Sequence, residues 1–326
     1  MEGSGWRVDK GKICHVYERQ ALRRVTGELV RPGDMSLTER AFSFCNLPPG
    51  AKVLDVGCGT GATTEYLIKK FELRAVGIDP SSLLLAQGLA RNPELPLLQA
   101  EGEALPFADS EMDGILAECS FSVMADTEQV LAEFFRVLKN DGYLILTDVY
   151  ARNPAGVAAL NSLPPASCLS GALSREELTH KLQTGGFSVA LWEDHSNVLK
   201  ELAAKLIFAH GSLGEFWRQA AGGSETEAVD AQKIMEAVAK AKPGYYLLVA
   251  RKKNILCVTE SVCPECLARI PACRVLQGND VFLEKCCPVH GYFRTPVWRG
   301  NPSIDSWVNR KSPSHPTAYY TESQKG

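Results

Sequence analysis

A glycine-rich turn is the first place where residue types and spacing could do chemistry. The motif Asp55-Val-Gly57-Cys-Gly59-Thr-Gly61 directly follows a short apolar run. Glycines at a strand-to-helix turn let a ligand approach the backbone and leave amide groups free at the helix N-terminus. Asp79 lies 20 residues beyond Gly59, where a carboxylate can accept hydrogen bonds from ribose hydroxyl groups. These residues predict a site for an adenosine-type ligand.

The turn alone fits two classes of such ligands, because Gly57-x-Gly59-x-x-Ala62 is also a variant of the dinucleotide fingerprint. Three further features separate the classes. Asp55 stands two residues before the first glycine, where a carboxylate can meet a cationic group. The third expected strand runs into the segment 101–107, Glu-Gly-Glu-Ala-Leu-Pro-Phe. The expected sheet ends with two further strands rather than with a second nucleotide-binding half.

Together these features resemble the class I S-adenosylmethionine-dependent methyltransferases, especially the UbiE-like (methyltransferase type 11) branch. That family carries D-x-G-x-G-x-G, an acid at the second strand, and an acid followed by an L-P-F segment. The resemblance covers residues 45–150 closely and extends more loosely to residue 251. It implies methyl transfer from S-adenosyl-L-methionine to a small-molecule or cofactor-pathway acceptor, with S-adenosylhomocysteine as the product.

The resemblance also implies how the cofactor is bound. The three glycines would surround the methionine part, Asp55 would orient its amino group, and Asp79 would hold the ribose. Glu101 stands where the family usually has Asp, facing the adenine amino group, and it is one carbon longer. The complete set of predicted cofactor-binding residues is Asp55, Gly57, Gly59, Gly61, Asp79, Glu101, Gly102 and Glu118.

A catalytic base is not identified by the sequence. The enzyme mainly has to align acceptor, methyl carbon and sulfur, and it needs a base only if the acceptor atom holds a proton. The candidates are His15 and Tyr17 on the leading helix, Tyr150 at the end of the fifth strand, and Cys168. Cys168 lies in the connection 151–173, which we expect to close over the cleft together with the leading helix.

A second chemical pattern lies in the last quarter of the chain, where six of the eleven cysteines crowd together. Cys263-Pro-Glu-Cys266 and Cys287-Pro-Val-His290 give the spacing C-x2-C-x20-C-x2-H. Three thiolates and one imidazole form a complete tetrahedral shell for a structural zinc ion. Cys286 could take the place of Cys287 as third ligand. A hairpin, with strands at 269–276 and 281–285, is expected between the two pairs.

Residues 255–300 resemble the cysteine ribbon that opens a subgroup of radical S-adenosylmethionine proteins. The matching stretches begin at Ser261, Phe282 and Val297. The cluster motif C-x3-C-x2-C of that subgroup does not occur in this chain, so the resemblance implies neither an iron–sulfur cluster nor radical chemistry. It implies a partner instead, a radical S-adenosylmethionine enzyme of the same pathway.

Short apolar runs alternate with helical patterns through the first 150 residues. This alternation predicts an α/β fold with a Rossmann-like, doubly wound and mostly parallel seven-stranded sheet. The expected strands are 53–57, 74–79, 96–100, 114–118, 143–149, 187–193 and 245–251. The expected domains are an N-terminal helical cap at 1–46, a methyltransferase domain at 47–251 with a helical insertion at about 196–242, a zinc ribbon at 255–300 and a flexible tail at 301–326.

Composition limits the remaining functions. The 326 residues carry a net charge of −3, with 45% hydrophobic and 22% charged residues, as in a globular protein. No apolar run is long enough for a membrane helix, and the start lacks a signal core, so we expect a cytoplasmic protein. Nucleic acid binding is disfavoured, because the Lys and Arg residues are dispersed. The sequence is also compatible with a non-catalytic binding scaffold for a radical enzyme and with an arsenite or thiol methyltransferase.

Overall fold

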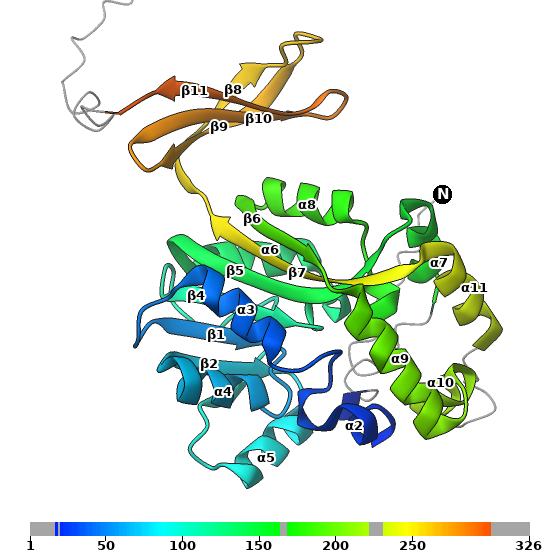
Figure 1. Ribbon diagram of the computed structural model, residues 1–326. Helices are drawn as coiled ribbons and strands as arrows, with labels where there is room; N and C mark the ends of the chain where they lie inside the picture. The colour runs from blue at the N-terminus through cyan, green and yellow to red at the C-terminus, as the bar shows by residue number, and fades with distance from the viewer. Residues whose placement is uncertain (1–16, 19, 164–167, 222–230, 301–326) are drawn as a thin grey trace, which may run out of the picture. The chain divides into compact units, whose positions relative to one another are not determined.

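The computed structural model describes residues 17–18, 20–163, 168–221 and 231–300. His15 and the expected tail at 301–326 lie outside these residues. The chain forms two compact units, Met1–Lys252 and Lys253–Gly326. Figure 1 shows the sheet of the first unit in blue, green and yellow, and the ribbon in orange.

The first unit is built on a seven-stranded sheet in the order β3-β2-β1-β4-β5-β7-β6. The pairs from β3 to β5 are parallel, and β7 runs antiparallel to both β5 and β6. This confirms the predicted Rossmann-like sheet. The strands are β1 (Lys52–Val56), β2 (Arg74–Asp79), β3 (Leu97–Gln99), β4 (Met112–Glu118), β5 (Leu138–Ala151), β6 (Phe187–Asp194) and β7 (Pro243–Lys252).

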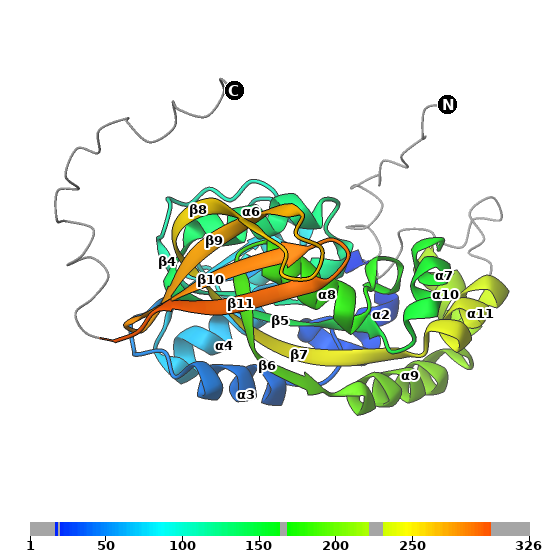
Figure 2. The ribbon, with the colours of Figure 1, turned by 90° about the horizontal axis from the view of Figure 1, so that it is seen from above.

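Helices cover both faces of this sheet, as expected for strands that are apolar throughout. Ala41 and Phe42 of one helix and Leu67 of another pack on one face, whereas Phe134 and Leu182 pack on the other. Figure 2 shows α3 and α4 on the opposite side of the sheet from α6. The α-helices are α2 (Gln20–Thr26), α3 (Ser36–Cys45), α4 (Ala62–Phe71), α5 (Ser82–Arg91), α6 (Thr127–Val137), α7 (Val157–Asn161), α8 (Arg175–Thr184), α9 (Ser196–His210), α10 (Leu213–Ala221) and α11 (Ala231–Ala241).

Local capping signals set two of the helix starts. The Ser81 hydroxyl accepts the N–H of Leu84 and caps α5, and Ser174 with Glu177 forms a capping box at α8. The fifth strand begins earlier than the expected start at residue 143. Because Leu138 is fully buried and pairs with Met112, the chain enters β5 at that residue.

The second unit is a four-stranded antiparallel sheet in the order β11-β10-β9-β8. The predicted hairpin is β9 (Arg269–Gln277) with β10 (Asp280–Cys287). The two outer strands, β8 (Asn254–Val262) and β11 (Gly291–Trp298), were not predicted from the sequence. Few residues are buried between them, chiefly Cys263, Ile270 and Cys287 with Phe293 packed against them.

We predict that a chain ending after Lys252 folds by itself, because the core of the first unit is complete at that point. Its thermal midpoint should lie within about 4 °C of the full chain, a shift equivalent to about 1–2 kcal/mol for a domain of this size. A chain ending after Lys242 is the control. It lacks β7, whose Tyr245 and Leu247–Ala250 are fully buried, and it should lose cooperative unfolding. A cooperative transition in the control would contradict this account.

Candidate functional site

A cavity lies where the order of the parallel strands reverses, since β1 has β2 on one side and β4 on the other. Ligands of open α/β sheets bind beyond the carboxyl ends of strands at such a reversal. Six of the eight predicted cofactor residues line the cavity, namely Gly57, Gly59, Asp79, Glu101, Gly102 and Glu118. Asp55 and Gly61 lie behind this wall. The N-terminal segment also contributes to the wall, through Tyr17 and residues 28–30.

The turn after β1 requires its glycines for two different reasons. Gly57, Gly59 and Gly61 all have φ between 57° and 75°, a backbone conformation that residues with a side chain rarely adopt. A Cβ on Gly57 would in addition lie 2.3 Å from the Cβ of Ser120. Ser120 follows β4 and donates its hydroxyl to the Val56 carbonyl at 2.6 Å. The close approach of the two strand ends therefore depends on the absence of a side chain at Gly57.

Asp79 ends β2 and faces the cavity. One carboxylate oxygen accepts the N–H of Gly59 at 2.9 Å, and the other accepts the N–H of Ser81 at 2.8 Å. Burial raises the pKa of Asp79, against the effect of these two amides. Each oxygen keeps acceptor capacity, so a diol in the cavity could donate to Asp79 while the turn stays in place.

Asp55 lies beneath the turn and accepts the Thr64 hydroxyl at 2.7 Å. It is 2% exposed, and burial raises its pKa to about 7. The Thr64 hydrogen bond and the Arg31 guanidinium oppose this rise in pKa, whereas the neighbouring Glu118 contributes to it. At neutral pH this carboxyl is thus close to its titration point.

Glu118 ends β4 and is held by three polar side chains. The hydroxyls of Thr38 and Thr63 lie 2.8 and 2.9 Å from its two oxygens, and the Nε of Arg31 lies 3.0 Å away. Arg31 itself is 3% exposed. Arg31 was not identified from the sequence, because Arg31-Pro-Gly-Asp34 has the pattern of an ordinary helix break and nothing local indicates a buried cation.

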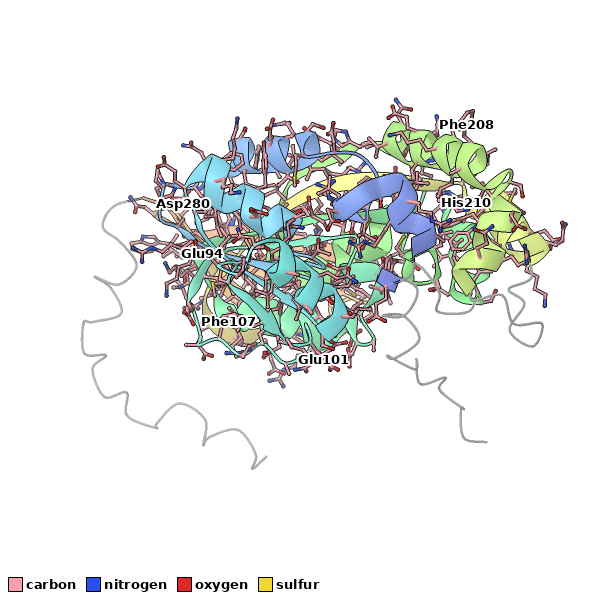
Figure 3. All side chains as sticks on the ribbon, turned by 90° about the horizontal axis from the view of Figure 1, so that it is seen from below. Glu94, Glu101, Phe107, Phe208, His210 and Asp280 are labelled. Carbon is pink, nitrogen blue, oxygen red and sulfur yellow. The ribbon has the colours of Figure 1, made fainter. Side chains whose placement is uncertain are left out.

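The far end of the cavity is formed by the segment after β3. A Cβ on Gly102 would lie 3.0 Å from the Met124 sulfur, so the backbone approaches that side chain closely. The Glu101 side chain reaches the surface of the unit at the lower edge of Figure 3. Glu103 accepts the N–H of Ala125 at 2.9 Å, which holds the next loop against this segment.

The candidate catalytic residues fall into separate places. The Tyr17 phenol lines the cavity and accepts the N–H of Cys168 at 3.0 Å. The Cys119 thiol lines the cavity and lies 3.2 Å from the Tyr245 hydroxyl, and the Cys168 side chain raises the pKa of this thiol. Tyr150 is not on the cavity wall, and its hydroxyl donates to Asp194 at 2.9 Å instead.

A second site lies in the ribbon, where one ligand atom from each of Cys263, Cys266, Cys287 and His290 falls within 4.8 Å of the others. The Cys266 and Cys287 sulfurs are 3.8 Å apart, and the His290 Nδ1 is 3.6 Å from Cys263 and 3.5 Å from Cys287. Zinc in a tetrahedron at about 2.3 Å from sulfur and about 2.0 Å from nitrogen requires edges of about 3.8 and 3.5 Å. The donor set therefore fits zinc.

Cys286 is not part of this set, because neighbouring residues of β10 point to opposite faces of the sheet and Cys287 supplies the ligand. The backbone N–H groups of Val289 and His290 lower the pKa of the Cys287 thiol. A thiol surrounded by backbone donors loses its proton readily, as a metal ligand must.

Comparison with known proteins identifies both units. Residues 54–146 match the family model "Methyltransferase domain", and residues 255–299 match the "HMPTM N-terminal zinc ribbon domain". The chain thus combines a class I methyltransferase domain with a C-terminal zinc ribbon.

Two curated relatives illustrate the match. The first unit is similar to phosphoethanolamine N-methyltransferase 1 of Arabidopsis thaliana, with 32% identity over 40% of this chain and 28% of that protein. It is also similar to the ubiquinone/menaquinone biosynthesis C-methyltransferase UbiE of Campylobacter jejuni, with 26% identity over 44% of this chain and 74% of that protein. The chain spans about a quarter of the length of the plant relative.

Solved structures share the fold. The [4+2]-cyclase SpnF has a TM-score of 0.59 at 22% identity, over 75% of this chain and 96% of that one. Phosphoethanolamine N-methyltransferase 2 of Haemonchus contortus, solved with S-adenosyl-L-methionine, has a TM-score of 0.56 at 16% identity, over 71% of this chain and 56% of that one. In the part of the chain that the structure describes, no helix is both long and apolar enough to cross a membrane.

We predict one zinc ion per chain. Cys287→Ser should abolish zinc binding and unfold the ribbon locally, because a structural site with few buried residues depends on its metal. Cys286→Ser is the matched control, one residue away and outside the cluster, and should retain a full complement of zinc. Elemental analysis and near-ultraviolet circular dichroism of protein purified without chelator provide the measurement. Equal zinc in both variants would overturn the ligand set.

We predict that the effect of Asp55→Asn on the stability of the ligand-free protein becomes more favourable from pH 5 to pH 8. A carboxyl whose pKa is raised from 3.8 to about 7 contributes stability below pH 4 and loses it as the pH rises through 7. The variant should therefore gain about 2–4 kcal/mol relative to wild type between pH 5 and pH 8, since one pKa unit corresponds to about 1.4 kcal/mol. Urea unfolding at both pH values measures the difference.

Asp113→Asn is the control of opposite sign. Although burial raises the pKa of Asp113, the Lys139 side chain and the Lys52 amide lower it below its usual value. Removing this charge should therefore destabilise the protein at pH 8. A pH-independent difference for Asp55→Asn would show that its carboxyl is not held out of water as described.

Proposed function

We propose that this protein transfers a methyl group from S-adenosylmethionine to a small-molecule acceptor. The observation that carries the proposal is the cavity at the strand reversal, lined by Gly57, Gly59 and Asp79, in a domain that matches the methyltransferase family model. The curated relatives are named as methyltransferases of small molecules. When bound, the cofactor supplies an electrophilic methyl group attached to a sulfonium.

The residues of this chain would bind and orient the cofactor. Asp79 would accept the two ribose hydroxyls, and the backbone of the glycine turn would contact the methionine part. The carboxyl groups of Asp55 and Glu118 would favour the positive charge of the sulfonium and the ammonium group through space. The segment at 101–102 would contact the adenine. The Tyr17 phenol would cover the opening toward the acceptor and exclude water.

The residues at the acceptor end of the cavity favour an acceptor atom that has a free lone pair and no proton to be removed. Burial raises the pKa of Tyr17, and the contact with Cys168 together with burial raises the pKa of Cys119. Burial raises the pKa of Asp148 to about 6, but this carboxyl lies off the cavity wall, where it accepts hydrogen bonds from Ser122 and from the N–H of Val149. The Tyr17 phenol and the Cys119 thiol do line the cavity, and both keep their protons at neutral pH.

A thiophilic acceptor is the second candidate, which would make the protein an arsenite or thiol methyltransferase. Cys58 and Cys119 line the cavity, and the Cys168 side chain is near enough to Cys119 to raise the pKa of its thiol. Two neighbouring thiols beside the site of methyl transfer suit a soft atom that binds sulfur. Methylation of arsenite that is lost in both Cys119→Ser and Cys168→Ser, with cofactor affinity unchanged, would favour this candidate.

Calorimetry with S-adenosylhomocysteine and with NAD tests the proposal first. We expect the protein to bind S-adenosylhomocysteine and not NAD. Binding of NAD without binding of S-adenosylhomocysteine would reject the proposal. Turnover with methyl-labelled cofactor against a panel of amines, thiols, quinols and arsenite then identifies the acceptor. Binding without turnover on any acceptor would favour the non-catalytic scaffold instead.

We further propose that a radical S-adenosylmethionine enzyme is a partner in the same pathway, and that the protein acts in the cytoplasm. The resemblance of residues 255–300 to the ribbon of such enzymes supports the partnership. Co-purification of the two proteins that requires an intact ribbon tests it, with Cys287→Ser as the negative control.

We predict that Asp79→Ala weakens the binding of S-adenosylhomocysteine by about 1–3 kcal/mol, because the ribose hydroxyls would be left poorly paired. Calorimetry at pH 7.5 measures the loss. Glu94→Ala is the control, since this exposed carboxylate is not part of the cavity lining, and it should change the affinity by less than twofold. Unchanged affinity in Asp79→Ala would show that Asp79 does not contact the ribose.

A further inference from the structure

A buried cation stands behind the wall of the cofactor cavity without an assigned role. The Arg31 guanidinium donates to the Asp34 carbonyl at 2.9 Å, the Pro32 carbonyl at 3.2 Å and the Thr38 hydroxyl at 2.9 Å, and its Nε pairs with Glu118. The Thr38 hydroxyl donates in turn to Glu118. A buried charge is tolerated only where partners of this kind surround it.

The loop that carries Arg31 forms part of the cavity wall in a strained conformation. Leu29 and Val30 line the cavity. Val30 is β-branched and has φ of 45°, a left-handed conformation that such residues rarely adopt. Strain of this kind persists only where the surrounding structure fixes the backbone. Arg31 is the next residue, and its contacts to Thr38 and Glu118 fix the loop at this point.

We propose that Arg31 is a positioning residue for S-adenosylmethionine: its buried ion pair with Glu118 holds the wall formed by Leu29 and Val30 against the glycine turn. This inference rests on the cofactor site proposed above. The link to the turn passes through Thr63 on the first turn of α4, whose hydroxyl donates to the same Glu118 oxygen that pairs with Arg31.

The ion pair also sets the charge near Asp55. Two carboxyl groups, those of Glu118 and Asp79, raise the pKa of Asp55. The Thr64 hydroxyl and the Arg31 guanidinium lower it. The Cys58 thiol also lies beside Asp55. Arg31 is the cation among them. Its removal leaves Glu118 uncompensated, so Asp55 takes up a proton at higher pH and loses its attraction for the ammonium group.

Calorimetry with S-adenosylhomocysteine tests the proposal on Arg31→Met, Arg31→Lys, Glu118→Gln and the double variant Arg31→Met with Glu118→Gln. Arg31→Met should weaken binding about tenfold at pH 7.5, and Arg31→Lys should recover part of that loss because it keeps the cation. The double variant should bind no more weakly than Arg31→Met, since coupled partners are not additive. In Arg31→Met the pH below which affinity falls should move upward.

Two comparisons separate this role from a general loss of stability. Arg40→Met removes another arginine of the same region, whose pair with Glu193 is exposed, and should leave the affinity unchanged. If Arg31→Met does not fold, Thr38→Val decides the question. It removes the bridging hydroxyl at constant shape and should weaken binding about threefold.

The proposal is overturned if Arg31→Met, or Thr38→Val where that variant is used, binds S-adenosylhomocysteine as tightly as the wild type. It is also overturned if the losses of the two single variants add up in the double variant, or if the pH dependence of binding is the same in Arg31→Met as in the wild type. Failure of the wild-type protein to bind S-adenosylhomocysteine overturns the proposed function, and with it this inference. Binding by wild type with no loss in the Arg31 variants overturns this inference alone.

Discussion

The first unit has to keep three carboxyl groups away from water at the point where the strand order reverses, and the rest of its structure depends on this constraint. Asp55, Asp79 and Glu118 stand at or next to the ends of three strands, where solvent cannot reach them freely. Each is retained because donors surround it. Backbone amides serve Asp79, hydroxyls from α3 and α4 serve the other two, and Arg31 adds the cation. The helices α3 and α4 and the loop at 27–35 therefore have two roles: they cover the sheet, and they supply the hydrogen bonds and the positive charge that these carboxyl groups need.

The parts that could be predicted from sequence are those in which one short motif both forms the element and carries the chemistry. The glycine turn is recognisable, because positive φ and close approach both require glycine at Gly57. The capping box at Ser174 is equally local. Asp79 could be predicted because its distance from the turn is fixed by one strand–helix–strand unit. In each case the signal and the structure span only a few residues.

Contacts that join distant segments could not be predicted in the same way. Arg31 meets Glu118, and Cys168 meets Cys119, only because of how the chain is wound. In the ribbon, β8 and β11 were missed because their exposed positions, such as Val258 and Val297, carry apolar residues and hide the alternation of a half-buried strand. The candidate metal ligands could be recognised because the geometry of a metal site restricts their spacing in the sequence. The small core of the ribbon, in contrast, imposes no regular pattern of apolar residues on its strands.

The place of β7 has a consequence for how the protein is made. It is the last strand of the first unit in sequence, yet it lies between β5 and β6. The sheet therefore keeps an open gap during synthesis at least until Lys252 has been added to the chain. At least 74 residues follow that point, which at about 5–20 residues per second leaves about 4–15 seconds. During this interval the chain is still attached to the ribosome while β7 can take its place between β5 and β6.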